Sequence, residues 1–272
     1  MVRTMTENLD ELKKDFLDKF QGLYGPAPEG FEEKVYSESA QKLLDLKKNG
    51  IAASVFDCEV CKDSKRIRLT NDKKDKLFGR TFWCPDCTDE DDLVRATGVD
   101  NAYKHWTLQQ LDLESDFVES CVADLRDEKS LMLFGKVGRG KTHMAVGLLR
   151  EWIRREKRKP AKFIYFPQFL DDMREMFGDS TQSQQAQQYE NQLSKFDLLV
   201  IDDLGAERTS EWVIERVNVL LDRRMREGRQ TIMTTNIMDL GEVSQRYGAR
   251  AASRLGGYRW KECSGLDHRL VQ

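Results

Sequence analysis

The sequence predicts an α/β protein in which a parallel sheet carries helices on both faces, preceded by a small cysteine-bearing module. Two observations indicate the sheet. The first is that short apolar runs alternate with stretches of helical periodicity after about residue 99. The second is a glycine-rich loop that joins the first of these apolar runs to a helix. The third observation is a pair of C-x-x-C motifs before residue 99, which indicates the module.

The elements of the sheet follow in chain order. Apolar runs predict strands at residues 131–134, 163–166, 198–201 and 231–234. A helix is expected after the glycine loop, and another over residues 211–227, where Gly228 follows as a stop signal. The serine- and glutamine-rich stretch 178–192 predicts a polar, mobile insertion.

Changes in composition predict three parts: a charged helical region at 1–50, the cysteine module at 51–98, and the α/β core at 99–272. The start of the chain is polar and acidic, which is atypical of a secretory signal, and no apolar run is long enough to span a bilayer. With a net charge of −3, DNA binding would have to come from local basic patches. Three such patches are candidates, at residues 150–159, 169–174 and 223–226, and the sequence does not choose between them.

The paired cysteines are Cys58, Cys61, Cys84 and Cys87. Strands predicted at residues 66–70 and 80–83, around the polar turn 71–76, would form a hairpin between the two pairs. Four thiolates held in this way can form a closed tetrahedral site, so we expect structural Zn²⁺ and a reducing compartment. A redox pair or an iron–sulfur cluster would use the same residues.

The glycine loop, residues 135–142, fits the phosphate-binding pattern G-x-x-x-x-G-K-[ST]. Its glycines let backbone N–H groups surround a phosphate, and the following helix directs its positive end at the same anion. The terminal amine of Lys141 would reach the β- and γ-phosphates, and the hydroxyl of Thr142 would hold Mg²⁺. The predicted nucleotide-binding residues are Gly135, Val137, Gly138, Arg139, Gly140, Lys141, Thr142, His143 and Asp202.

Polar residues follow the later strands in the order expected for nucleotide hydrolysis. Asp202 would hold Mg²⁺, and Asp203 would orient or deprotonate the attacking water. Because Asp is shorter than the Glu found in many ATPases, hydrolysis is expected to be slow. Asn236 would sense the γ-phosphate, or would cap the next turn. Arg254, on a predicted helix after residue 248, would act as an arginine finger on a neighbouring subunit, unless it belongs to a solvated basic face.

Four segments, at residues 135–142, 198–207, 234–236 and 247–255, together resemble the AAA+ ATPases of the DnaC/DnaI helicase-loader group, with IstB as a sister branch. The stretch 103–108 is similar to the lead-in strand that this group places next to the adenine. The resemblance implies an AAA+ P-loop NTPase core. The chain ends shortly after Arg254, so we expect no C-terminal helical lid. Arg250 and Arg269 are further candidates for nucleotide contact.

The resemblance also implies a function. Loaders of this group bind ATP, associate as a spiral or ring, and deliver a DnaB-type hexameric helicase onto single-stranded DNA. We therefore expect an ATPase with ATP, Mg²⁺ and Zn²⁺ as cofactors, in the cytoplasm of a bacterium or a phage-infected bacterium, whose turnover is stimulated by DNA or a partner. The alternatives are an IstB-like helper of a transposase and a DNA-binding scaffold that binds ATP but hydrolyses little of it.

Overall fold

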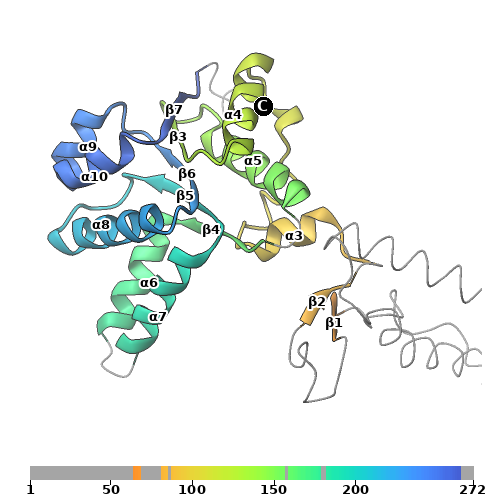
Figure 1. Cartoon of the computed structure of the whole chain (residues 1–272), viewed down its shortest axis with the longest axis horizontal. Coiled ribbons are helices and arrows are strands. Elements are labelled where there is room, and N and C mark those ends of the chain that lie inside the picture. The colour runs from red at the N-terminus through yellow and green to blue at the C-terminus, as the bar shows by residue number, and fades with distance from the viewer. Residues whose placement is uncertain (1–63, 69–80, 85–86, 157–158, 179–181, 265–272) are drawn as a thin grey trace, which may run out of the picture. The chain divides into compact units, whose positions relative to one another are not determined.

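The structure of the protein is a computed structural model that describes residues 64–68, 81–84, 87–156, 159–178 and 182–264 (Figure 1). The chain divides into two compact units, Met1–Asp89 and Glu90–Gln272. The second unit thus begins before the boundary expected at residues 98/99. The physical reason is helix α3 (Glu90–Ala96), whose Val94 is fully buried in the same apolar cluster as Val99. No helix in the described ranges is long and apolar enough to cross a membrane.

In the first unit, β1 (Arg66–Arg68) and β2 (Thr81–Trp83) pair antiparallel, which confirms the pairing expected of the hairpin. Cys84 follows β2 directly. Its side chain is buried, and its backbone N–H donates to the Lys65 carbonyl at 2.9 Å. Cys58 and Cys61 lie outside the described residues. Among the described residues no group of three metal-ligating side chains occurs, so the four-cysteine zinc site stays a prediction.

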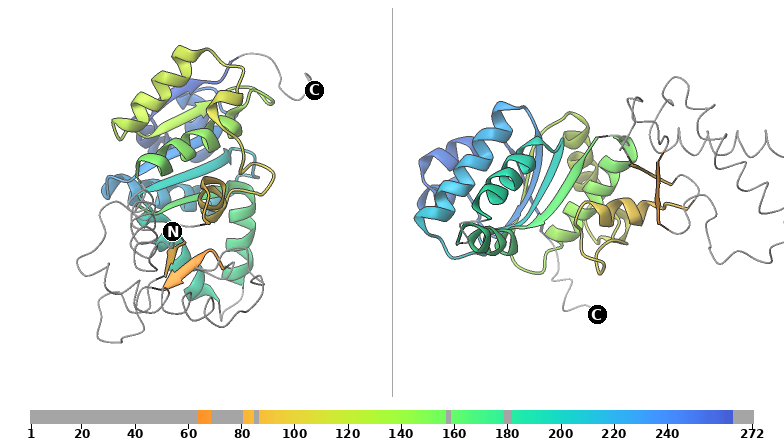
Figure 2. Two further views of the ribbon diagram at one scale, coloured as in Figure 1. Left: turned by 90° about the vertical axis from the view of Figure 1, so that its right-hand side faces the viewer. Right: turned by 90° about the horizontal axis from the view of Figure 1, so that it is seen from below.

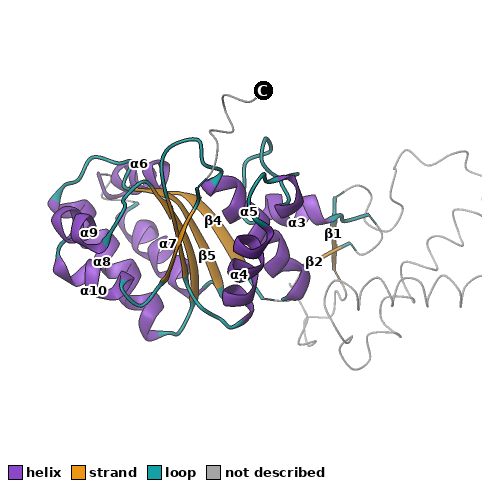
Figure 3. Cartoon of the chain, turned by 90° about the horizontal axis from the view of Figure 1, so that it is seen from above, coloured by secondary structure: helices purple, strands orange, loops and turns teal. Residues whose placement is uncertain are grey.

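The described part of the second unit is built on a five-stranded parallel sheet, drawn in orange in Figure 3. Its strand order is β4-β5-β6-β3-β7 (Figure 1). The strands are β3 (Leu131–Phe134), β4 (Ala161–Tyr165), β5 (Leu198–Leu204), β6 (Gln230–Thr235) and β7 (Arg259–Glu262). The four predicted strands are confirmed, and β7 is an addition that its polar sequence had hidden. Because the strands run parallel, their carboxyl ends lie at one edge of the sheet.

Helices cover both faces of this sheet (Figure 2). Successive strand side chains point to opposite faces, so Leu131 and Leu133 belong to one apolar cluster and Met132 to the other. The first cluster is completed by α3, the short 3₁₀ helix η1 (Leu108–Gln110), α4 (Ser115–Arg126) and α5 (Lys141–Arg155). The second is completed by α6 (Phe166–Gly178), α7 (Ser183–Lys195), α8 (Glu211–Arg226), α9 (Leu240–Tyr247) and α10 (Ala249–Leu255).

Helix α7 corrects the prediction of a mobile polar insertion at residues 178–192. From Ser183 onward the stretch belongs to a regular helix whose buried residues are Ala186, Glu190, Leu193 and Ser194, spaced as one helical face. The Glu190 carboxylate pairs with Arg216 and Arg223 of α8, each at 3.2 Å. Glutamines on the exposed face give the stretch a low-complexity composition, which concealed this narrow packed stripe.

Candidate nucleotide site

The glycine loop connects β3 to α5, in the context that the sequence predicted. Gly135, Gly138 and Gly140 have φ angles of 141°, 81° and 74°, which L side chains rarely adopt. A Cβ on Gly135 would also lie 2.7 Å from the carbonyl oxygen of Cys263. Side chains are therefore excluded along the inner turn of the loop. Val137 projects outward with 56% of its surface exposed.

Lys141, the first residue of α5, is buried, with 6% of its surface exposed. Its Nζ donates to the carbonyl oxygens of Gly135 at 2.9 Å and Lys136 at 2.8 Å. The ammonium group thus lies inside the loop, at the amino end of α5. An anion enclosed by the loop backbone would meet both this charge and the positive end of the helix dipole.

Thr142 and the acidic end of β5 meet beside the loop. The Thr142 hydroxyl donates to Asp202 Oδ2 at 3.2 Å, and the Thr234 hydroxyl donates to Asp202 Oδ1 at 2.6 Å. Strand β6 lies between β3 and β5, so Thr234 connects the loop strand to the acidic strand. Sequence reasoning missed the role of Thr234, although its place on a buried strand, two residues before Asn236, was an available signal.

Asp202 is held in an environment that disfavours its charge. Only 4% of its surface is exposed, and burial, together with the neighbouring Asp203 carboxylate, raises the pKa of Asp202 to about 6. Hydrogen bonds from Thr234 and Thr142 and the charge of Lys141 act in the opposite direction. A divalent cation would compensate the buried negative charge, and a hydroxyl beside a carboxylate is the oxygen donor set that Mg²⁺ prefers. Thr142 and Asp202 therefore fit Mg²⁺.

Asp203 occupies an irregular position in β5, where the pairing with β6 shifts between Ile201 and Leu204. Its φ of 59° is left-handed, and its N–H donates to the Thr234 hydroxyl at 2.9 Å. Such strained residues are concentrated at functional sites. Asn236 follows β6 and is exposed at the same edge of the sheet.

Arg254 lies on α10, which packs on the face of the sheet opposite α5. Its Nη2 pairs with Asp222 Oδ1 of α8 at 2.5 Å, and its Nη1 donates to the Arg250 carbonyl at 3.2 Å. The structure therefore does not bring Arg254 to the glycine loop of its own chain. Arg250 is exposed, and Arg269 lies outside the described residues.

Aromatic rings stack beside the loop. The Tyr103 and Trp106 ring centroids are 4.3 Å apart, and those of Trp106 and His143 are 4.6 Å apart. The expected lead-in strand at residues 103–108 is wrong, because this segment consists of turns that lead into η1. Turns allow the rings to stack on a residue of α5, which the alternating side chains of a strand would prevent.

Glu207 joins two of the segments on which the family resemblance rests. Its Oε2 accepts from the Gly205 N–H at 2.9 Å, and its Oε1 accepts from the Tyr247 hydroxyl. Arg246 donates to the Glu207 carbonyl. Burial and the hydrogen bond to Glu207 raise the pKa of Tyr247, so the phenol stays protonated as the donor. The loop after β5 is thereby fixed to the end of α9, just before the helix that carries Arg254.

Most arginines of the three basic patches are held by partners within the fold. Arg150 is buried against Glu90 at 2.7 Å and Asp91 at 2.5 Å, and Arg174 pairs with Asp171 at 2.9 Å. Arg224 is 1% exposed and donates to backbone carbonyls around the end of α7. The buried Arg150 and Arg224 therefore stabilise the fold and are poorly available to DNA phosphates, whereas the side chain of Arg174 remains 43% exposed.

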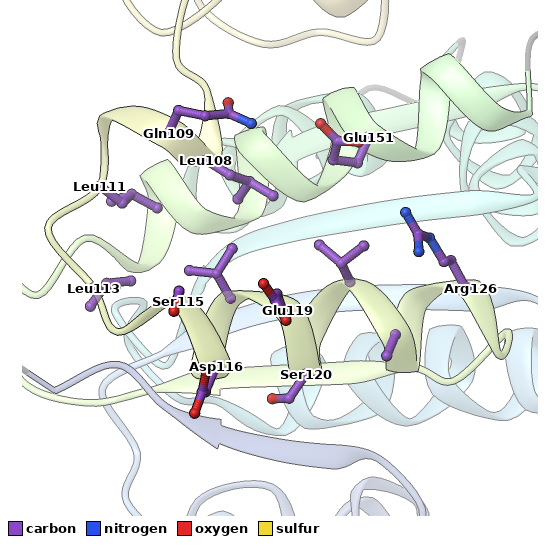
Figure 4. A pocket seen from close by; sticks show the side chains of 13 residues that line it. Leu108, Gln109, Leu111, Leu113, Ser115, Asp116, Glu119, Ser120, Arg126 and Glu151 are labelled. Atoms are coloured by element: carbon purple, nitrogen blue, oxygen red, sulfur yellow. The ribbon is translucent and has the colours of Figure 1, made fainter.

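A groove of about 900 Å³ lies between α4 and α5, apart from the glycine loop and the aspartates of β5 (Figure 4). Leucines of the η1 segment, including Leu108 and Leu111, line one side, and Glu119 and Arg126 of α4 line the other. No residue of the glycine loop and neither aspartate of β5 belongs to its lining. The groove is therefore not the nucleotide site.

Known proteins share this fold and this sequence pattern. The chain is 33% identical over 133 residues to the replicative helicase loader DnaC of Escherichia coli K12, which covers 48% of this chain and 52% of the relative. It is 29% identical over 161 residues to the replicative helicase loader DnaI of Bacillus subtilis, covering 59% of this chain and 45% of that relative. The chain thus spans about half the length of these curated relatives.

Among solved structures, a crystal structure of the DnaC helicase loader superposes with a TM-score of 0.51 at 20% identity, covering 60% of this chain and 99% of that one. At this identity the likeness shows the fold alone, which is that of an AAA+ domain. The family described as IstB-like ATP binding protein matches residues 107–254, more than half of the chain, and the match includes the glycine loop, Asp202 and Arg254. The chain belongs to the IstB-like ATP binding protein family.

Proposed function

We propose that this protein is an ATPase that loads a DnaB-type replicative helicase onto single-stranded DNA. The ATPase activity is supported by one observation: Lys141, Thr142 and Asp202 lie close together at one edge of the sheet. The loader part is supported by the curated relatives, both of which are named replicative helicase loaders.

We assign the following roles to the site residues. The loop backbone and Lys141 bind the β- and γ-phosphates of ATP, and Thr142 and Asp202 hold Mg²⁺, which withdraws charge from the phosphates. Asp203 orients the attacking water, with its backbone fixed by Thr234. Asn236 contacts the γ-phosphate from the end of β6. The Tyr103–Trp106–His143 stack offers a flat surface for the adenine.

Arg254 completes the site of a neighbouring subunit. A guanidinium directed at the γ-phosphate stabilises the charge of the transition state. Because Arg254 lies on the face opposite α5, one chain cannot use its own arginine, and hydrolysis requires association into a spiral or ring. Mixing tests this arrangement: Lys141→Ala and Arg254→Ala proteins, each strongly impaired alone, should regain turnover together. Mixtures that stay inactive although both variants fold and associate would exclude action between subunits.

The first unit binds the helicase, and the AAA+ core binds single-stranded DNA. Cys58, Cys61, Cys84 and Cys87 hold Zn²⁺, and the antiparallel β1–β2 pair supports this by keeping the segment before Cys84 in a hairpin. Because α3 belongs to the core, a core fragment should begin at Glu90. This fragment should bind ATP and DNA but not helicase.

The loading activity is tested on forked DNA whose single strand is coated with single-strand binding protein. Wild-type protein with ATP should raise unwinding by the cognate helicase, and Lys141→Ala should not. The matched control is Lys136→Ala, which removes an exposed lysine of the same loop and should load normally. If wild-type protein adds nothing to the unaided helicase and neither unit binds it, the loader proposal fails.

A second candidate function is that of an IstB-like helper of a transposase. One observation favours it, the match to the family described as IstB-like ATP binding protein. An IstB-like helper would bind a transposase in place of a helicase. Pull-down with this protein against both partners distinguishes the two functions, because the ATP site is common to them and the partner is not.

A further inference from the structure

The carboxylate of Asp222 lies between two arginines where α8 meets α10. Its Oδ1 accepts from Arg254 Nη2 at 2.5 Å, and its Oδ2 accepts from Arg226 Nη2 at 2.5 Å. The two arginines differ in surroundings: the Arg254 side chain is 17% exposed, and that of Arg226 is 76% exposed. Asp222 therefore holds one arginine in a defined place and contacts another that extends into solvent.

The bonds of Arg254 fix its direction without using up its donors. Nη2 is held by Asp222, and Nη1 donates to the Arg250 carbonyl of the same helix at 3.2 Å. A guanidinium carries more N–H groups than these bonds occupy, so donors remain for an anion. Arg254 can therefore be oriented by Asp222 and still donate to a phosphate.

We propose that Asp222 is a positioning residue for Arg254, which fixes the guanidinium before a neighbouring subunit's nucleotide arrives. The inference rests on the proposed action of Arg254 between subunits. A free arginine side chain loses much rotamer freedom when it engages a phosphate, and that loss opposes assembly of the site. An arginine already ordered by Asp222 avoids this loss, so the shared site forms with its catalytic charge in place.

Turnover measured without DNA, at saturating protein and ATP, tests the proposal. Asp222→Asn should lower kcat about threefold to tenfold, with the KM for ATP unchanged, because it disorders the finger and leaves the ATP-binding loop intact. Asp222→Glu keeps the carboxylate and should recover part of the loss. The matched control is Arg226→Gln, which removes the other partner of Asp222 and should leave kcat within about twofold of wild type.

Two further measurements separate positioning from a plain stabilising ion pair. In an Arg254→Ala background, Asp222→Asn should not reduce the residual turnover further, since it acts through an arginine that is absent. Mixing Asp222→Asn with Lys141→Ala should restore turnover, because the Lys141→Ala subunit supplies an intact finger. A further loss in the double variant, or no recovery on mixing, overturns the inference.

The turnover of Arg254→Ala separates the positioning role of Asp222 from the proposed action of Arg254 between subunits. If Arg254→Ala keeps full turnover, the shared site itself is wrong, and the role of Asp222 falls with it. If Arg254→Ala abolishes turnover while Asp222→Asn leaves kcat unchanged, the shared site stands and only the positioning role is refuted.

Discussion

Replacing Arg224 by Met should destabilise the fold and leave intrinsic DNA affinity almost unchanged. Arg224 belongs by sequence to the basic patch 223–226, yet its guanidinium is buried in the second unit. Burial lowers its pKa to about 10, so it remains charged at neutral pH. Its donors meet the Thr231 hydroxyl at 2.8 Å and the carbonyls of Leu193 at 2.9 Å and Phe196 at 3.0 Å.

The expected magnitude follows from the acceptors that would lose their donor. Besides Thr231, Leu193 and Phe196, the Gln230 carbonyl accepts from Arg224 at 2.5 Å. Each buried acceptor left without a donor costs about 1–3 kcal/mol, and burial of the apolar Met side chain offsets part of the sum. We expect the free energy of unfolding to fall by about 3–5 kcal/mol, because the four neutral acceptors lose their donor and the apolar Met side chain offsets only part of that cost.

Urea denaturation followed by circular dichroism measures this change. With a slope of about 2–3 kcal/mol per molar urea, the midpoint should fall by about 1–2.5 M. Arg226→Gln changes a nearby surface arginine and should shift the free energy of unfolding by less than about 1 kcal/mol. DNA binding, measured well below the transition, should have the same salt slope in Arg224→Met as in wild type.

The opposite pattern would refute this reasoning. If Arg224→Met unfolds at the wild-type midpoint but binds DNA weakly and with a reduced salt slope, the guanidinium contacts phosphate. The hydrogen bonds of Arg224 inside the fold would then not form in solution.

Three more predictions concern the sites themselves. In metal-free protein, burial raises the pKa of Asp202 from 3.8 to about 6. Ionisation of this carboxyl therefore lowers the free energy of unfolding by about 3 kcal/mol above pH 6. The penalty disappears as the pH falls toward 4, because the carboxyl is then protonated in the folded protein. Asp202→Asn should therefore be the more stable protein in thermal melts at pH 7.5 but not at pH 4, and it should bind Mg²⁺–ATP weakly; equal stability at both pH values contradicts the argument. Gly135→Ala should abolish ATP binding in fluorescent-nucleotide titrations, since its Cβ would strike the Cys263 carbonyl at a φ of 141°, whereas unchanged affinity would show that the loop can shift. Purified protein should contain one zinc per chain by elemental analysis and lose it in Cys84→Ser; reduced wild-type protein without metal would rule the site out.

The sequence predicts the strands and the glycine loop well because their signals are local. A loop that must enclose phosphate needs glycines at fixed spacing, and a buried parallel strand needs a short apolar run. Strand β7 escaped because Arg259 and Lys261 interrupt its pattern. At the edge of the sheet such side chains remain partly exposed, and Lys261 reaches Asp124 at 2.7 Å.

Partners distant in sequence were beyond prediction. Residues such as Arg224, Glu207 and Asp222 have ordinary surface types, and only the packing of α7, α8, α9 and α10 brings them to their partners. The same limit applies to Thr234, whose hydroxyl gains its role because strand order places β6 between the loop and the acidic strand. The basic patches meet a related limit, because counting positive charges does not reveal which carboxylates the fold brings to them.

The placement of α5 and Arg254 on opposite faces of the sheet determines how many complete nucleotide sites an assembly contains. If each complete site needs a loop from one chain and an arginine from the next, a closed ring of n subunits has n sites, and an open spiral has n − 1. A dimer then has one site, and a monomer none. At low protein concentration turnover should rise with the square of concentration, and a spiral should always keep one loop at its end that binds ATP without hydrolysing it. That terminal subunit would stay in the ATP state for as long as the spiral remains open, and ring closure would release it.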